Sequence, residues 1–232
     1  MLELNYSKFL FNKKEVWFFD GEQINESPYT TYLYYNTYPG GKIIEEESCL
    51  IDLTKSLAEI KANISKTTQL HINKANNFET SFNIEFSPSL KNVLEFNSIF
   101  KLFAQKKNIA FSSERIIALH KTNNLVLSYA YSKNELTTIH AYLHDSKSVV
   151  LLHTFNLLNN NSLSAICNKY LHWQEIVMFK EKRFQIYDFG GIDLIKVPGI
   201  SQFKLSFGAT IVKRYSAIKT NSFFKLLNSL RA

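Results

Sequence analysis

From Ser81 onward, apolar and polar positions repeat with two alternating periods, and these predict strands interleaved with helices. Residues 81–86 alternate as a strand, and residues 88–107 repeat as an amphipathic helix. A shorter helix follows, with Ser112 or Ser113 as its N-cap. This part of the chain therefore begins as strand, helix, helix.

Three further strands are predicted at residues 125–131, 137–143 and 148–155. The connections between them, residues 132–135 and 144–147, are polar and have the length of hairpin loops. Strands joined by such short loops pair antiparallel with their sequence neighbours. We therefore expect an antiparallel meander.

The remainder of the chain returns to helical and then mixed periods. A long amphipathic helix is predicted at 162–183, capped by Asn159–Ser162, and it leads into a short apolar strand at 184–189. A helical crossover of this length places the two strands that it joins parallel, so 184–189 should lie beside 148–155. One or two helical turns, a final strand and a closing helix are expected at 200–207, 209–215 and 221–230.

The first 80 residues give weaker signals. A short strand at 15–19 ends at the Asp20–Gly21 turn, and residues 29–38 hold five tyrosines before Pro39-Gly40-Gly41. These tyrosines suit an aromatic edge strand, and stacking on sugars or bases is the alternative. Residues 52–76 predict one helix, opened by a capping box of Ser56 and Glu59. Its lysines form either a solvated face or a basic binding face.

Composition limits the classes of protein. The 232 residues are 45% apolar and 20% charged, as in globular proteins, and a net charge of +7 suits anionic partners. Cys49 and Cys167 are too few for a disulfide framework, and the six histidines are scattered, so we expect no metal site. We find no signal peptide and no run of ~20 apolar residues, so the expectation is a soluble, cytoplasmic protein.

Glycine is concentrated at one place. Four of the seven glycines fall between Gly190 and Gly208, beside Asp188 and Lys204. Glycine is needed where the backbone takes a positive φ or where another group approaches closely. The ends of core strands are where α/β proteins usually keep their sites. Two ordinary turns around a short helix are the alternative.

Three motifs in order carry a family resemblance. They are YLHWQ at 170–174, YDFGGI at 187–192 and FKLSFG at 203–208, and the segments SKTT (65–68) and INKA (72–75) add to them. Together with the predicted element order, they resemble the FemAB-like branch of the GNAT acyltransferase superfamily over roughly residues 50–215. The implied fold is α/β (α+β), a GNAT-like mixed, mainly antiparallel sheet with flanking helices. Residues 1–50 would be a β-rich extension or partial second half, and 51–232 the FemAB-like domain.

The resemblance also implies an activity: transfer of an acyl or aminoacyl group to an amino group of a cell-envelope precursor, in peptidoglycan or polysaccharide biosynthesis. The implied donor is acyl-CoA or aminoacyl-tRNA, and the implied partners are an anionic small-molecule or lipid-linked precursor and tRNA. Residues 69–71 lack the arginines typical of the family, and 159–164 lack the glycine-rich loop that binds CoA pyrophosphate, so the donor stays open. A catalytically silent protein that binds an acidic precursor or a partner enzyme is the alternative.

Three residues are candidates for catalysis. Asp188 could orient the amine or accept its proton, or it could only cap the glycine turn. Lys204 could neutralise a phosphate or an oxyanion, or it could be solvated. His140 could shuttle a proton, or it could be a core histidine. We expect these three to line one pocket at the end of the 184–189 strand. The candidate substrate-binding residues are Tyr142, Gly190, Gly191, Phe203 and Lys66.

Overall fold

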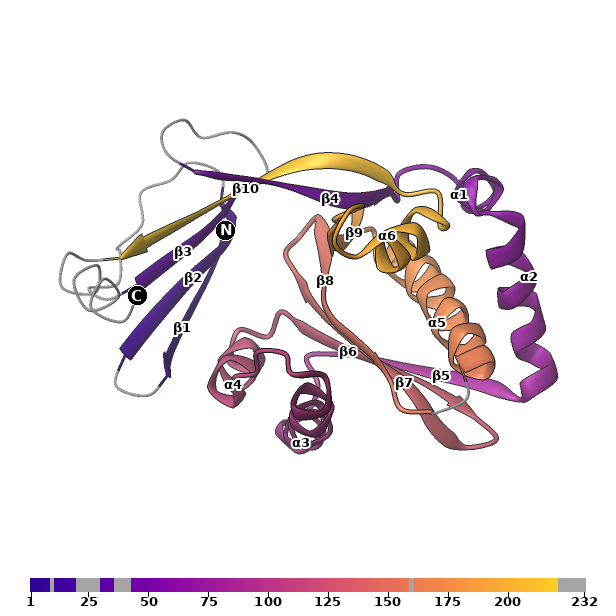
Figure 1. Cartoon of the computed structure of the whole chain (residues 1–232), viewed down its shortest axis with the longest axis horizontal. Helices are drawn as coiled ribbons and strands as arrows, with labels where there is room; N and C mark the ends of the chain where they lie inside the picture. Colours follow the sequence, from indigo (N-terminus) through magenta and orange to yellow (C-terminus); the bar gives the residue numbers. More distant parts are fainter. Residues whose placement is uncertain (9–10, 20–29, 36–42, 159–160, 221–232) are drawn as a thin grey trace. The chain divides into compact units, whose positions relative to one another are not determined.

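The computed structural model describes residues 1–8, 11–19, 30–35, 43–158 and 161–220 (Figure 1). Asp20–Gly21, Pro39–Gly41, part of the tyrosine-rich segment, Asn159–Asn160 and the closing helix predicted at 221–230 lie outside these residues. The described chain groups into two compact units. One contains residues 47–89 and 123–212, and the other contains 1–46, 90–122 and 213–232.

The predicted meander forms the centre of the unit that contains residues 47–89 and 123–212. Strands β6 (Leu125–Ser132), β7 (Glu135–His144) and β8 (Ser148–Asn156) pair antiparallel in sequence order. Strand β9 (Ile186–Gly191) lies parallel to β8. The expectation of an antiparallel meander followed by one parallel strand is confirmed.

Two strands extend this sheet at its sides. Strand β5 (Thr80–Phe86) pairs antiparallel with β6, as the alternating pattern predicts. Strand β4 (Ile44–Asp52) pairs antiparallel with β9. The sequence pattern did not single out β4, because its first half is charged and exposed while only Ser48, Cys49 and Ile51 are buried.

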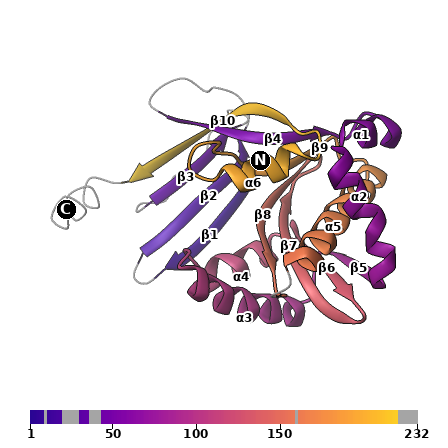
Figure 2. The same ribbon diagram turned by 45° about the vertical axis from the view of Figure 1, so that its right-hand side comes forward.

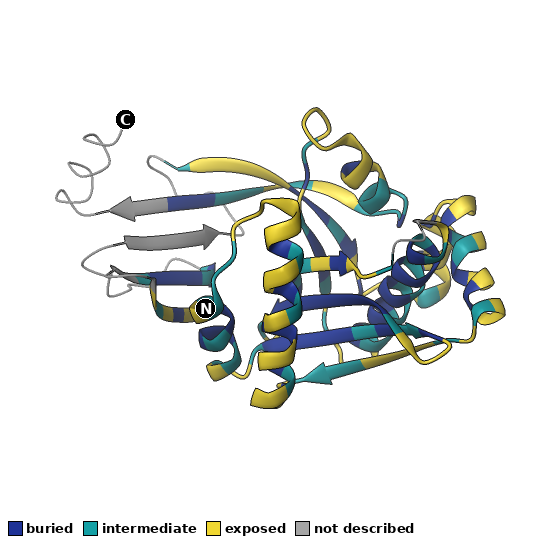
Figure 3. Ribbon diagram, turned by 60° about the horizontal axis from the view of Figure 1, so that its bottom comes forward, coloured by how far each residue is buried: buried dark blue, intermediate teal, exposed yellow. Residues whose placement is uncertain are grey.

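Helices pack against this sheet. Helix α5 (Asn161–Glu181) connects β8 to β9, and α6 (Pro198–Leu205) follows β9. Helix α2 (Lys66–Lys74) lies beside α5 (Figure 1 and Figure 2). Figure 3 shows buried residues along the central strands and exposed ones on the outer helix faces. Among the described helices, none is long and apolar enough to cross a membrane.

The single helix expected at 52–76 is wrong. The segment forms α1 (Leu57–Asn63), α2 and a short 3₁₀ helix η1 (Ala75–Phe78). The capping box of Ser56 and Glu59 is present, but Ser65 opens a second helix as its N-cap. The backbone N–H of Ser65 donates to the carbonyl of Ser206 at 2.8 Å. A tertiary contact therefore replaces a helical hydrogen bond at this point, which local periodicity cannot show.

The other unit contains β1 (Leu2–Lys8), β2 (Phe11–Phe19), β3 (Thr30–Tyr35) and the end of β10 (Thr210–Thr220). β1 pairs antiparallel with β2, β2 parallel with β3, and β3 antiparallel with β10. Helices α3 (Leu90–Lys107) and α4 (Ser113–Lys121) belong to this unit. Arg115 of α4 donates two hydrogen bonds, of 2.7 and 2.9 Å, to the buried carboxylate of Glu15. This bidentate ion pair joins α4 to β2.

Two glycines use a conformation that other residues rarely adopt. Gly190 has a φ of 74° and Gly208 a φ of 75°. A Cβ at Gly190 would lie 3.1 Å from the carbonyl oxygen of Leu151, and one at Gly208 would lie 2.6 Å from the Asn63 backbone oxygen. Gly199, in the first turn of α6, has nothing within 4 Å of such a Cβ. Gly190 and Gly208 therefore each combine a positive φ with the close approach of another backbone atom.

We expect three alanine substitutions to rank by this geometry. Gly208→Ala should destabilise by roughly 2–4 kcal/mol, because a strained φ adds to overlap with backbone, and Gly190→Ala by about 1–2 kcal/mol. Gly199→Ala, the matched control, should stabilise by about 0.5–1 kcal/mol, because alanine loses less conformational entropy in a helix. Urea unfolding measures all three. An equal effect at Gly199 and Gly208 would contradict the assigned backbone.

Candidate functional site

A cluster of polar side chains lies inside the core between α5 and the sheet. The carboxylate of Glu175, fully buried on α5, lies 2.8 Å from His140 Nδ1 of β7 and 3.2 Å from His172 Nδ1. The hydroxyl of Tyr142 donates to Glu175 and lies 2.8 Å from the hydroxyl of Tyr187. Tyr187 in turn contacts His172 Nδ1 at 2.7 Å. We call these five residues the Glu175 network.

The strand and helix periods explain why these residues meet. His140 and Tyr142 are two apart on β7, so they share one face of the sheet. His172 and Glu175 are three apart on α5, so they share the helix face that covers the sheet. Tyr187 reaches the same interior from β9.

Burial and mutual contacts shift the pKa values of this network. Burial alone would raise the pKa of Glu175, but the charge and hydrogen bond of His140, with those of His172, outweigh it and lower the pKa to about 2. Burial, together with neighbouring His140, lowers the pKa of His172 to about 4. Burial and the Glu175 carboxylate raise the pKa of both tyrosines. Glu175 is therefore ionised and His172 neutral at neutral pH.

The surroundings of His172 are aromatic. Its ring lies 5.1 Å from the ring of Phe189, 5.4 Å from Phe203 and 5.5 Å from Phe207, measured between centroids. Its Nε2 is buried and has no hydrogen-bond partner in the described part of the chain. A proton on Nε2 would therefore place an N–H donor in apolar surroundings, which is the physical cost behind the lowered pKa.

His140, His172 and Glu175 can each offer a metal ligand atom within 4.8 Å of the others. The two imidazole rings are stacked, however, with centroids 4.1 Å apart and planes inclined by 27°. Both rings direct Nδ1 to the same carboxylate. The geometry is that of a hydrogen-bond network.

A second polar group lies where β9 leaves the sheet. The carboxylate of Asp188 accepts a hydrogen bond from the Ser48 hydroxyl of β4 and one of 2.7 Å from the backbone N–H of Gly190. The ammonium of Lys204 on α6 donates to the carbonyl of Gly191 and lies 3.4 Å from that of Gly190. Burial lowers the pKa of Lys204, while the charges of Cys49 and Asp188 act in the opposite direction.

The structure brings Asp188, Lys204, Gly190 and Gly191 together, and it places His140 apart from them. Tyr187 points into the Glu175 network, and side chains alternate along a strand, so Asp188 faces the opposite side of the sheet. The three candidate catalytic residues therefore do not share one pocket. His140 is a core histidine whose Nδ1 contacts Glu175 while its buried Nε2 has no partner among the described residues, and Asp188 does cap the glycine turn.

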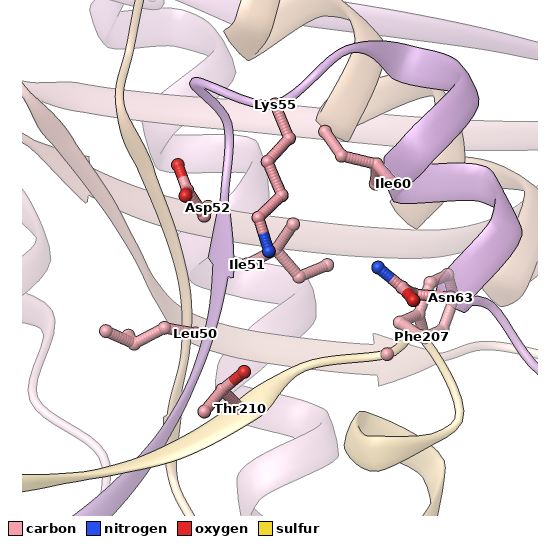
Figure 4. A pocket seen from close by; sticks show the side chains of 9 residues that line it. Leu50, Ile51, Asp52, Lys55, Ile60, Asn63, Phe207 and Thr210 are labelled. Carbon is pink, nitrogen blue, oxygen red and sulfur yellow. The ribbon is translucent and has the colours of Figure 1, made fainter.

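The remaining candidate residues are spread over this unit. Tyr142 is fully buried in the network, and Phe203 packs its ring against His172. Lys66 is exposed at the start of α2. A shallow pocket lies elsewhere, between β4, α1 and the start of β10 (Figure 4), and none of the predicted site residues lines it. In Figure 4 the side chains of Lys55 and Asn63 point toward each other across this pocket.

Sequence reasoning missed Glu175, the place of His172 in the network and the contact of Ser48 with Asp188. The signal for Glu175 was its spacing of three from His172 on the apolar face of a long helix, where a carboxylate needs buried partners. Ser48 gave no signal, because its strand was not predicted.

No protein-family model matches the sequence, and no curated protein does. Solved structures do. The C-terminal domain (DUF2156) of a protein assigned as a lysylphosphatidylglycerol synthetase from Agrobacterium fabrum has a TM-score of 0.60 and 11% identity, over 87% of this chain and 72% of that one. FemX has a TM-score of 0.60 and 11% identity, over 78% of this chain and 63% of its own. L-PGS from Bacillus licheniformis has a TM-score of 0.57 and 12% identity, over 88% and 72%.

At these identities the likeness concerns the fold. The protein has an α/β fold, a mixed, mainly antiparallel sheet with flanking helices, as the sequence predicted. This fold is similar to that of FemX and of the lysylphosphatidylglycerol synthetase domain, in keeping with the fold that the resemblance to the FemAB-like branch implies. The chain spans just under two thirds of FemX.

Acid should destabilise the protein in two stages. The unfolded chain protonates His172 below its ordinary pKa of 6.5, but the folded protein does so only near 4, so stability is lost between these values as pH falls. The lowered pKa of Glu175 contributes stability above 4.5 that is lost as pH falls toward about 2. Urea unfolding across this range measures both stages.

His172→Phe should flatten the first stage, because it removes the titrating ring and keeps an aromatic side chain. Tyr187→Phe, the control, removes a hydroxyl from the same network and should keep the pH dependence even if overall stability falls. An unchanged slope between pH 6.5 and about 4 in His172→Phe would show that the ring titrates normally.

Proposed function

We propose that this protein transfers an acyl or aminoacyl group to an amine on a cell-envelope precursor. The observation that carries the proposal is the way β8 and β9 part, in a fold shared with FemX and L-PGS. Their parallel ladder covers three residue pairs, from Ser148–Ile186 to Val150–Asp188. Both strands continue beyond it.

The end of the ladder between β8 and β9 has a local cause. The positive φ of Gly190, two residues after Asp188, breaks the regular strand conformation at the end of the ladder, and Gly191 then pairs with Ser48 of β4. An extended chain can bind to strand backbone through main-chain hydrogen bonds. The pantetheine of acyl-CoA, an aminoacyl ester and a peptide stem all carry such amide or carbonyl groups. The end of the β8–β9 ladder suits a substrate of this kind.

Amide formation needs a neutral amine, a stabilised oxyanion and an acceptor for the amine's proton. In the proposed reaction, the amine attacks the carbonyl carbon of the donor, and the donor's thiolate or ribose oxygen leaves. Lys204 supplies positive charge beside the Gly190–Gly191 turn, and its half-buried position strengthens that charge's field. Asp188, held by Ser48 and Gly190, is the carboxylate at the same turn.

The donor is acyl-CoA or aminoacyl-tRNA, and the two can be separated directly. Purified protein is incubated with each radiolabelled donor and a UDP-amino sugar or UDP-linked peptide acceptor, and label transfer is measured. A donor at 100 times its dissociation constant should also stabilise the fold by about 2.7 kcal/mol in thermal unfolding. If the donors stabilise the fold but neither transfers its label, the result would support the alternative, a catalytically silent binding protein.

Two variants separate a chemical role of Asp188 from a purely structural one. Asp188→Asn keeps the turn's shape but removes the carboxylate charge, so turnover should fall about ten- to hundredfold with donor binding unchanged. Ser48→Ala, the matched control, removes one hydrogen bond to the same carboxylate and keeps the charge, so turnover should stay within about threefold. Equal losses of turnover in both variants would show that Asp188 only caps the turn.

A further inference from the structure

The loop between β9 and α6 exposes a run of aliphatic side chains. All residues from Leu194 to Ile200 are exposed. Ile195 is 91% exposed, and the other large aliphatic residues of this run are exposed by between 41% and 57%: Leu194, Val197 and Ile200. We call residues 194–200 the aliphatic tip. Single exposed aliphatic residues are ordinary, but four within seven positions form a local apolar surface.

Hydrogen bonds fix the tip in this outward position. The carboxylate of Asp193 accepts from the backbone N–H groups of Ile195 at 3.0 Å and Lys196 at 2.8 Å. The Ser201 hydroxyl donates to the Asp193 carbonyl at 2.8 Å and lies 3.2 Å from the Asp193 backbone nitrogen. The Val197 N–H donates to the Asp193 carbonyl at 3.1 Å, and Pro198 then starts α6. The turn is therefore closed at both ends, and its exposed side chains are presented by a fixed backbone.

The chemistry of the tip favours one kind of surface. A protein partner that recognises aliphatic side chains usually offers pockets for them, with hydrogen bonds at the rim. A bilayer surface needs only protruding aliphatic side chains beside a cation that remains among the headgroups. Lys196 stands inside the tip with its side chain 85% exposed and its ammonium 3.7 Å from the Asp193 carboxylate, and the chain has a net charge of +7. Both suit the negative potential of an anionic lipid surface.

We propose that the aliphatic tip docks this protein onto an anionic lipid bilayer, with Leu194, Ile195, Val197 and Ile200 inserted at the headgroup boundary and Lys196 at the phosphates. The tip begins three residues after Gly191, whose carbonyl accepts from Lys204. Docking would therefore hold the Gly190–Gly191 turn close to the lipid surface. If the proposed function holds, a lipid-linked acceptor would be presented there.

Vesicle flotation tests the docking without any assay of transfer, so its failure is separate from failure of the proposed function. The full chain is mixed with vesicles of phosphatidylcholine alone, or with roughly a quarter phosphatidylglycerol, and the floated fraction is measured. The wild type should float with the anionic vesicles, more strongly at low salt. Ile195→Ser should weaken the partition constant by about tenfold or more, and Lys196→Gln should reduce the preference for anionic vesicles.

The matched control is Leu102→Ser. Leu102 is 69% exposed on α3 and lies outside the tip, so its loss should leave flotation unchanged. Circular dichroism checks that each variant is folded. Absence of flotation in the wild type, or equal losses in Ile195→Ser and Leu102→Ser, would overturn the proposal. So would a wild-type dimer in gel filtration that Ile195→Ser dissociates without any vesicle binding, because the tip would then join two copies of the chain.

Discussion

The buried carboxylate of Glu175 is the constraint on which the core of the unit with residues 47–89 and 123–212 depends. It draws hydrogen bonds from β7 and from its own helix, while Tyr142 and Tyr187 link it to β9. An ionised carboxylate without partners in such a core would cost several kcal/mol. The helix can therefore rest on the sheet only in a register that brings His140 and both tyrosines to Glu175. Apolar packing around Phe179 and Phe189 tolerates small shifts of the helix along the sheet, but the hydrogen bonds of the Glu175 network do not.

The same network limits what the core residues can do. His140 is a candidate proton carrier in the sequence, yet its Nδ1 and that of His172 face Glu175, and both buried Nε2 atoms have no hydrogen-bond partner among the described residues. Their chemistry is used to hold the fold. The groups near the end of β9, Asp188 and Lys204, are fixed by different partners, Ser48 and the glycine carbonyls. Tyr187 of the network and Asp188 of the proposed site thus lie on opposite faces of one strand.

The sequence predicted what local periodicity determines. The alternation at 125–155 gave the meander, because each of these strands has a consistently buried side, and the helical period at 162–183 gave the crossover to a parallel strand. The break at Ser65 was not visible, since it depends on Ser206, far away in sequence. The Glu175 network could not be predicted from the sequence for a similar reason. Spacing puts His172 and Glu175 on one helix face, but only the assembled sheet shows that His140 and Tyr187 lie opposite them.

The register of β9 links the Glu175 network to the contact between Asp188 and Ser48. Tyr187 and Asp188 are consecutive, so the position that commits Tyr187 to the network also fixes Asp188 against Ser48 on the other face. Gly190 then turns the chain at a fixed distance from both. A slip of one residue would exchange the two faces, burying the carboxylate beside Glu175, where like charges repel. The network therefore fixes the register in which Asp188 meets Ser48 and the glycine turn follows, and Lys204 joins them through the carbonyl of Gly191.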